Sequence, residues 1–326
     1  MSNYPTPIFI FSLPRSGSTL LQRLLAAHEQ IATVSESHLL LPFLYTLKRD
    51  GVYSAYNHRF TVWAFEEFCR DLPDGIATYR AEIRELALRL YAKAAKEETA
   101  YFVDKAAAYH LIAPEIMQLF PEAKFIFLWR NPLAVAASLI DSWKNGQWNL
   151  YEHDVRLYEG LPQLIDAYTQ HTNNVVALRY EDLLQQPEQE MARVFAYLQL
   201  PFDAEITETF AQVQLKGRTG DSVGMAKYKT LNQEPLQKWK QTLANPLRKA
   251  WSRRYLQQIG SAQLASIGYD LDELHQAIKD TPISTQHLFS DLLRRPYGVL
   301  YRYLDGPLLR HKGQRWRNGQ RVYAHK

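Results

Sequence analysis

The sequence is poor in cysteine and lacks long apolar runs. Cys69 is its only cysteine, so no intramolecular disulfide can form, as is usual for proteins of reducing compartments. No apolar run approaches the ~20 residues that a membrane helix needs. Residues 1–7 show no basic region followed by a signal-like apolar core. We therefore expect a cytoplasmic protein without a transmembrane segment.

The chain also lacks a strong charge of either sign. Its 38 Lys and Arg residues against 34 Asp and Glu residues give a formal net charge of +4. This mild balance suits an anionic ligand, but it does not indicate nucleic acid binding. Hydrophobic residues make up 46% of the 326 residues, which is typical of a folded chain with a buried core.

Three short apolar runs have the composition of buried strands. They cover residues 8–13, 123–129 and 174–178 and are rich in Ile, Phe, Val and Leu. Strands that alternate with helices predict an α/β domain, with a mainly parallel sheet flanked by helices. Apolar residues at helical spacing predict helices at residues 18–27, 78–95, 109–119 and 188–198.

The last part of the chain has a different composition. Residues 291–326 contain nine Lys or Arg residues against two acids, with five Tyr and Trp residues interleaved. We expect a main domain over residues 1–290 and a basic extension over 291–326, partly helical near residues 300–309. An acidic partner is one interpretation of this extension, and a solvated tail without a partner is the other.

The segment after the first predicted strand has the features of an anion site. Gly17 lets the backbone approach a ligand closely, and amides at a helix start have no backbone partner. Arg15 adds a permanent positive charge, and hydroxyl groups surround the glycine. The Gly-x-x-x-x-Gly-Lys-Ser/Thr pattern of nucleoside triphosphatases is absent, since Ser18 stands where its lysine would be. A kinase or ATPase would therefore lack its phosphate-binding lysine.

This loop resembles the 5′-phosphosulfate loop of sulfotransferases that use 3′-phosphoadenosine 5′-phosphosulfate (PAPS). The residue pattern of the loop is most similar to that of tyrosylprotein sulfotransferases and of bacterial sulfotransferases of polyketide assembly lines. The resemblance implies a sulfotransferase fold, a P-loop-like parallel sheet flanked by helices. The alternative is an ordinary strand-to-helix turn. The resemblance assigns cofactor binding to Arg15, Ser16, Gly17, Ser18, Thr19 and Leu20.

A second anion site is needed, because PAPS also carries a 3′-phosphate. The family places an arginine at the end of a strand and a serine eight residues later, and Arg130 and Ser138 have that spacing. Asn131 can cap the helix between them, and Pro132 suits its first turn. Arg130 as a surface cation is the alternative.

Further segments are similar to the family. Tyr180, in the segment Arg-Tyr-Glu-Asp-Leu, either faces the nucleotide or is a packed core residue. Lys229 stands ten residues before Trp239, at the offset of a phosphate-contacting lysine in tyrosylprotein sulfotransferases, with Lys227 as a neighbour that could replace it. Residues 219–222 resemble a loop that folds over the nucleotide.

The family chemistry needs a base for the acceptor proton and a cation for the departing group. The resemblance assigns the base to Glu36, which lies 21 residues after Arg15, and leaves His38 as the alternative base or as a residue that orients the acceptor. Lys105 is the expected cation, although Ala106 and Ala107 replace the family's Thr-Pro. Arg15 shares the developing charge.

The resemblance therefore implies sulfonate transfer from PAPS to an acceptor hydroxyl, with release of 3′,5′-adenosine bisphosphate. The acceptor would be a small molecule, a lipid, a carbohydrate or a carrier-bound group. No metal is expected, because the scheme does not require one. The alternatives are a metal-dependent phosphotransferase with a degenerate P-loop and a nucleotide-binding module without activity.

Overall fold

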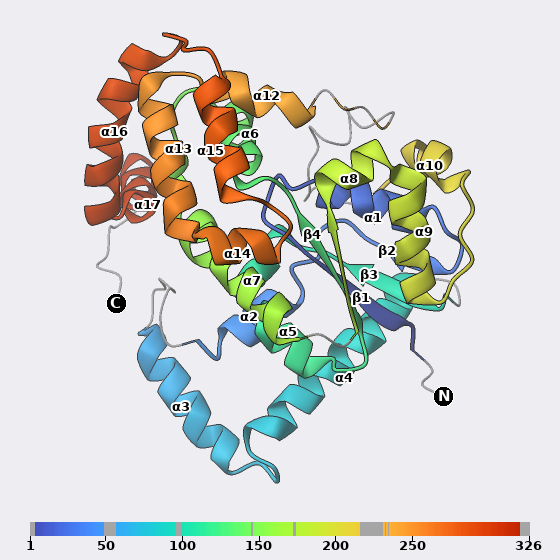
Figure 1. The fold of residues 1–326 in the computed structure, drawn as a ribbon. Helices are drawn as coiled ribbons and strands as arrows, with labels where there is room; N and C mark the ends of the chain where they lie inside the picture. Colours follow the sequence, from blue (N-terminus) through green and yellow to red (C-terminus); the bar gives the residue numbers. More distant parts are fainter. Residues whose placement is uncertain are drawn as a thin grey trace.

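The computed structural model describes residues 4–48, 57–95, 99–144, 146–171, 174–215, 231, 233 and 235–319 (Figure 1). Its centre is a parallel sheet with the strand order β2-β3-β1-β4-β5. All four neighbouring pairs run in parallel, which confirms the predicted α/β class. The strands are β1 (Thr6–Phe11), β2 (Ile31–Thr33), β3 (Tyr101–Asp104), β4 (Lys124–Trp129) and β5 (Val175–Arg179).

The three predicted strands correspond to β1, β4 and β5. Strand β1 ends at Phe11, two residues before the predicted end, because Ser12 and Leu13 already lead into the following loop. The apolar patterns do not include β2 and β3. These strands have three and four residues, too few to show a periodicity.

The two faces of the sheet differ in chemistry because side chains alternate along each strand. On β1, Phe9 and Phe11 point to one face and isoleucines to the other, and β4 repeats the arrangement with Phe125 and Phe127. The ring centroids of Phe9 and Phe125 lie 6.0 Å apart, and those of Phe11 and Phe127 lie 5.2 Å apart. We call these the aromatic face and the aliphatic face.

Helices cover both faces. The aliphatic face packs against α1 (Ser18–Ala26), α8 (Tyr180–Gln185), α9 (Pro187–Leu198) and α10 (Ile206–Thr209). The core on the aromatic face contains residues of α2 (Leu40–Tyr45), α4 (Ile76–Ala95), α5 (Ala113–Leu119), α6 (Pro132–Lys144), α7 (Leu161–Gln170), α12 (Pro235–Thr242), α13 (Pro246–Ile259), α14 (Ser261–Ser266) and α15 (Leu271–Asp280). Helix α3 (His58–Arg70) projects from the lower edge in Figure 1.

The direction of the chain connections reverses between β1 and β4. These strands are neighbours, but the chain leaves β1 toward β2 and leaves β4 toward β5, on opposite sides of the sheet. The connections begin with α1 on the aliphatic face and with α6 on the aromatic face. Ligands of open α/β sheets bind at such a point, outside the carboxyl ends of the strands.

The single helix predicted over residues 109–119 is wrong. The chain forms a 3-10 helix (Ala107–Leu111) and then begins α5 at Ala113. Pro114 explains the interruption, because it has no amide hydrogen to donate to the preceding turn. Proline is tolerated at the start of α5, where that hydrogen would have no helical partner.

The C-terminal segment forms two helices, α16 (Leu288–Tyr303) and α17 (Gly306–Arg317). The helix predicted near residues 300–309 is therefore interrupted. Asp305 has φ 50° and its side chain accepts a hydrogen bond from the amide of Leu308, so it ends one helix and caps the next. The domain boundary at residue 290 stays a prediction. Within the described part of the chain, every helix falls short of the length and apolar character needed to span a bilayer.

His110, in the 3-10 helix, is a buried histidine with one hydrogen-bonded nitrogen. Its Nδ1 lies 2.7 Å from the carbonyl oxygen of Ala107, so Nδ1 carries the donated hydrogen. Burial lowers the pKa of His110 from 6.5 to about 4, and the positive charge of Arg156 acts in the same direction. The folded protein therefore keeps this imidazole neutral.

We predict that acidification from pH 6.5 to pH 4 destabilises the fold through His110. In this window the unfolded chain binds a proton that the folded chain does not, so stability is lost as the pH falls. The lowered pKa corresponds to at most about 3 kcal/mol. Urea unfolding at several pH values is the measurement. His110→Gln should show a weaker pH dependence than the unchanged chain, and parallel curves would contradict the prediction.

Candidate active site

The loop between β1 and α1 has an unusual backbone. Arg15 has φ 71° and Gly17 has φ 92°, and a positive φ is uncommon for a residue with a Cβ such as arginine. Gly17 is the N-cap of α1, and no side chain caps this helix within the described chain. The first amides of α1 are thus available to an anion, and Ser18 and Thr19 add hydroxyl groups in the same turn. This is the predicted phosphate loop.

Gly17 is required by its neighbour as well as by its backbone. A Cβ atom there would lie 2.4 Å from two ring atoms of Tyr180, the first residue of α8. Tyr180 is fully buried, and the Arg130 guanidinium lies over its ring at 4.6 Å from the centroid. Tyr180 thus packs against both Gly17 and Arg130, and its role toward a nucleotide stays a prediction.

Arg130 follows β4 and joins the two predicted phosphate sites. Its Nη1 donates a hydrogen bond to the carbonyl oxygen of Arg15 at 2.6 Å, and Arg15 Nε donates to Ser138 Oγ at 3.2 Å. The amide of Leu133 donates to Asn131 Oδ1 at 2.9 Å, which confirms the predicted cap of α6. The buried Arg130 Nε has no partner among the residues that the structure describes. Arg15, Arg130 and Ser138 therefore form one cluster, with a donor available for a ligand.

Lys105 is the centre of a second cluster. It directly follows β3, its side chain is only 2% exposed, and its Nζ lies 2.7 Å from Glu36 Oε1. The same Nζ donates to Thr19 Oγ1 in the phosphate loop at 3.3 Å. His38 Nε2 lies 3.4 Å from the second oxygen of Glu36. The expected base, the expected cation and the alternative base are thus in direct contact beside the phosphate loop.

Asp104, next to Lys105, anchors the segment that carries Glu36 and His38. Its carboxylate is buried and accepts hydrogen bonds from the hydroxyls of Tyr91 at 2.6 Å, Tyr109 at 2.8 Å and Ser37 at 2.8 Å. Burial raises the pKa of Asp104, and these three hydrogen bonds oppose the rise. The bond from Ser37 joins the chain between Glu36 and His38 to the end of β3.

Sequence reasoning missed this anchor. Asp104 belongs to the segment that identified Lys105, but nothing in the sequence shows that Tyr91, Tyr109 and Ser37 converge on it. Tyr91 is one apolar position of a helical stripe, and Tyr109 begins a predicted helix. Only the packing of α4 and the 3-10 helix around the end of β3 brings the hydroxyls together.

The remaining predicted residues lie in the phosphate loop or outside the described residues. Arg15 donates a hydrogen bond to Ser138, which joins it to the Arg130 cluster. Ser16 and Leu20 are buried within the loop and the first turn of α1. Lys229, Lys227 and residues 219–222 lie outside the described residues, and their roles stay predictions.

Comparisons with known proteins found a matching family model and a related protein. The model of the sulfotransferase family matches residues 7–204, which include all of the sheet except Thr6 and both clusters. The nodulation protein NoeE of Sinorhizobium fredii is 30% identical over 222 aligned positions, covering 61% of this chain. The match spans about half of that protein's length (51%).

Two solved structures are similar to this chain. The sulfotransferase domain of the Synechococcus PCC 7002 olefin synthase is 22% identical, with a TM-score of 0.50, and the match covers 73% of this chain and 89% of that domain. The sulfotransferase domain from the curacin biosynthetic pathway is 25% identical, with a TM-score of 0.49, over 79% of this chain and 98% of that domain. The first likeness supports the fold predicted from the phosphate loop.

We predict that Gly17→Ala lowers the free energy of unfolding by about 2–4 kcal/mol. Roughly 1–2 kcal/mol comes from the positive φ, and the rest comes from the collision with Tyr180. Gly75→Ala is the matched control, because Gly75 also has a positive φ (60°) but a Cβ there would meet only an ordinary contact at 3.8 Å. Urea denaturation of both variants is the measurement. Equal losses would show that Tyr180 does not restrict Gly17.

Proposed function

The chain belongs to the sulfotransferase family, and from this membership and the site geometry we propose that it transfers a sulfonate group from PAPS to an acceptor hydroxyl. The observation that carries the proposal is the position of Lys105. Its ammonium contacts both Thr19 in the phosphate loop and the Glu36 carboxylate. A donor bound at the phosphate loop would thus lie beside a cation, Lys105, and beside a base, Glu36.

The reaction would be an in-line displacement at sulfur. The acceptor oxygen forms a bond to sulfur while the bond between sulfur and the bridging oxygen of the donor breaks. Glu36 takes the proton of the acceptor hydroxyl, and 3′,5′-adenosine bisphosphate leaves with the bonding electron pair. Lys105 stabilises the charge that develops on the bridging oxygen, an interaction stronger in the transition state than in the ground state.

Arg130 and Ser138 would hold the 3′-phosphate of the donor, and Arg15 would serve the neighbouring 5′-phosphosulfate loop. The Arg130 guanidinium is already positioned by the Tyr180 ring and by the Arg15 carbonyl oxygen, so little side-chain freedom would be lost on binding. The phosphate would accept from Arg130 Nε and from the Ser138 hydroxyl. Lys229 would add a further contact, as the family resemblance implies.

The acceptor is proposed only as a class. It would be a hydroxyl on a small molecule, a lipid, a carbohydrate or a carrier-bound group. The name of NoeE, a nodulation protein, adds no acceptor chemistry. Screening such acceptors by mass spectrometry for a gain of ~80 Da, the mass of SO₃, would identify the class. The cytoplasmic location and the independence from metal stay predictions.

Two alternatives make different demands. A metal-dependent phosphotransferase would bind ATP more tightly with Mg²⁺, although the loop has no lysine of the Gly-Lys-Ser/Thr type. An inactive nucleotide-binding module would bind the nucleotide but transfer nothing. The contact between Lys105 and Glu36 favours an active enzyme, because nucleotide binding alone does not require a base beside the loop.

We predict that the protein binds 3′,5′-adenosine bisphosphate without added Mg²⁺, and that Ser138→Ala weakens this binding about tenfold. The loss reflects one hydrogen bond to a charged phosphate. Adenosine 5′-monophosphate has no 3′-phosphate, so its affinity should not change in the variant. Isothermal titration calorimetry with both nucleotides is the measurement.

Ser142→Ala is the control, because Ser142 lies one turn further along α6. It should leave both affinities unchanged. Equal losses for the two nucleotides in Ser138→Ala would remove Ser138 from the 3′-phosphate site. A preference for ATP that requires Mg²⁺ would overturn the proposed donor.

We predict that Glu36→Gln lowers sulfonate transfer by about 10²–10⁴-fold, the usual contribution of a general base. The amide keeps a hydrogen-bond acceptor for Lys105, so the affinity for 3′,5′-adenosine bisphosphate should stay within error. Transfer of labelled sulfonate from PAPS is the assay. An active Glu36→Gln together with an inactive His38→Ala would move the base to His38.

A further inference from the structure

The outer face of α16 is apolar along the whole helix. Six of its residues, at spacings that share one side of a helix, are between 50% and 85% exposed. A soluble surface helix normally shows charged and polar residues on its outer side. We call this set the α16 face, and it consists of Phe289, Leu292, Leu293, Val299, Leu300 and Tyr303.

The inner side of α16 fixes this face to the body of the protein. Asp291 is fully buried and forms a two-pronged ion pair with Arg248 of α13, with N–O distances of 2.6 and 2.9 Å. Further along the helix, Arg302 pairs with Asp154. The apolar side chains are therefore exposed because the opposite side of α16, which carries the buried Asp291, packs against the body.

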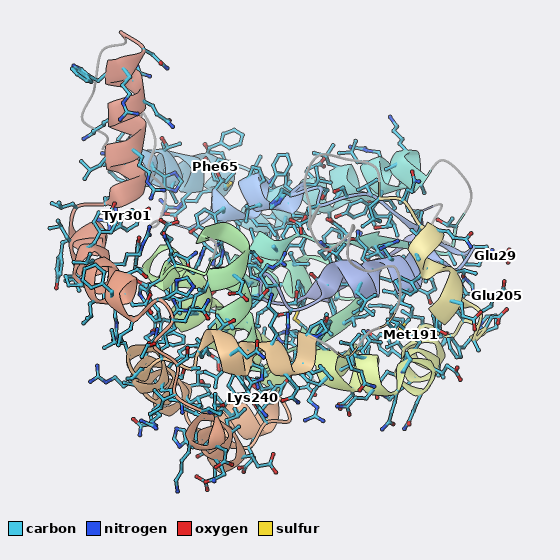
Figure 2. All side chains as sticks on the ribbon, turned by 90° about the horizontal axis from the view of Figure 1, so that it is seen from above. Glu29, Phe65, Met191, Glu205, Lys240 and Tyr301 are labelled. Carbon is cyan, nitrogen blue, oxygen red and sulfur yellow. The ribbon has the colours of Figure 1, made fainter. Side chains whose placement is uncertain are left out.

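Helix α17 adds positive charge and an aromatic anchor. Figure 2 shows that α17 extends away from the body beyond Tyr301, and Trp316 on it is 74% exposed. Arginines stand at positions 310, 315 and 317 of this helix, and Arg310 pairs with Glu152 of the body. Over residues 291–326 the charge is nine Lys or Arg residues against two acids.

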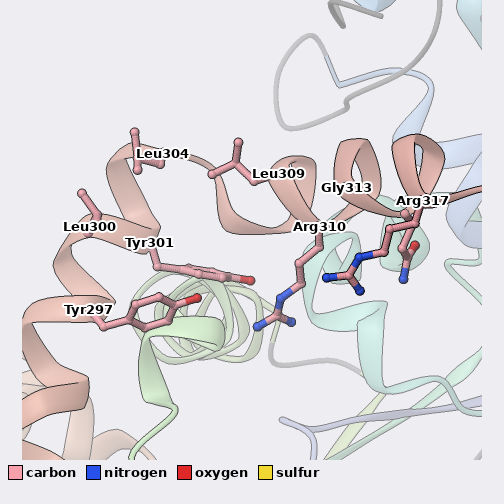
Figure 3. A pocket seen from close by; sticks show the side chains of 9 residues that line it. Tyr297, Leu300, Tyr301, Leu304, Leu309, Arg310, Gly313 and Arg317 are labelled. Carbon is pink, nitrogen blue, oxygen red and sulfur yellow. The ribbon is translucent and has the colours of Figure 1, made fainter. Parts of the chain in front are cut away.

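A cavity of about 370 Å³ opens between the two helices (Figure 3). Tyr297, Leu300 and Leu309 line its apolar side, and Arg310 and Arg317 line the other. Apolar walls beside guanidinium groups match the chemistry of an acyl chain with an anionic headgroup.

We propose that α16 and α17 dock on the surface of an anionic lipid bilayer. The α16 face enters the boundary between headgroups and acyl chains, and the basic residues of α17 contact the anionic headgroups. The 16 residues of α16, with three arginines among them, are too few and too charged to cross the bilayer, so the helix lies on it. Trp316 and Tyr303 suit the interfacial level, where aromatic side chains with a polar group are enriched.

Other occupants fit these features less well. A second copy of the chain would cover the α16 face, but it would bring two strongly basic α17 helices near one another. An acidic carrier protein would complement the arginines of α17, yet it would leave an apolar strip of Phe, Leu and Val unmatched. A bilayer with anionic lipids meets both requirements. The inference does not depend on the proposed sulfonate transfer.

Vesicle co-sedimentation with the full chain tests the proposal. We expect binding to vesicles of phosphatidylcholine mixed with phosphatidylglycerol, and much weaker binding to phosphatidylcholine alone. Salt should reduce the bound fraction, because the basic residues contribute through screened charges. Leu293→Glu and Leu300→Glu should each weaken binding by about tenfold or more, since each replaces a buried apolar contact by a charge in the interface.

Phe60→Glu is the matched control, because Phe60 is also 60% exposed but lies on α3. It should bind vesicles like the unchanged chain, and circular dichroism should show the same fold for all variants. An equal loss in Phe60→Glu would overturn the assignment to the α16 face. Absence of binding to any vesicle would overturn the proposal. The proposal would also be overturned if the unchanged chain did not bind vesicles but formed a dimer in sedimentation velocity that Leu293→Glu dissociates.

Discussion

One buried positive charge organises the candidate active site. The Lys105 ammonium is withdrawn from water, and an unpaired charge in that position would cost several kcal/mol. Its partners come from two other places in the chain, Thr19 at the start of α1 and Glu36 after β2. The ends of β1, β2 and β3 must therefore meet for the fold to be stable. Glu36, which is proposed as the base in sulfonate transfer, is also the partner of the buried Lys105 ammonium. The same contact therefore serves the stability of the fold and the proposed chemistry.

The order of the strands in the sheet determines how the loops after β1 and β4 are arranged. Because β1 and β4 are parallel neighbours, their following loops emerge side by side, and Arg130 reaches the Arg15 carbonyl oxygen directly. The arginine then lies on a tyrosine ring that also restricts Gly17. Two loops that are more than a hundred residues apart in sequence are thus in direct contact, and they carry both predicted phosphate sites. The aromatic and aliphatic faces of the sheet place α6 and α1 on opposite sides of it.

The sequence was sufficient to predict those parts of the protein that show a recognisable apolar pattern or motif. Buried runs predicted β1, β4 and β5, and the residues around Gly17, Arg130, Glu36 and Lys105 predicted the loops that converge. It was insufficient where long-range packing decides the outcome. The hydroxyls around Asp104 come from separate elements, and the close approach of the Tyr180 ring to Gly17 joins residues far apart in the sequence. Pro114 divides the helix predicted over residues 109–119. Hydrophobic periodicity did not predict this, because it does not take into account that proline lacks the amide hydrogen for a helical hydrogen bond.

The ion pair between Arg248 and Asp291 has a consequence for how the two parts of the chain are connected. Arg248 also donates hydrogen bonds to the carbonyl oxygens of Thr242 at 2.8 Å and Gly146 at 2.7 Å, so a single guanidinium joins α16 to the body at several points. A chain that ended at residue 290 would keep the buried arginine and lose its carboxylate. This buried ion pair ties α16 to α13, so the packing of α16 on the body depends on a carboxylate that the C-terminal segment supplies.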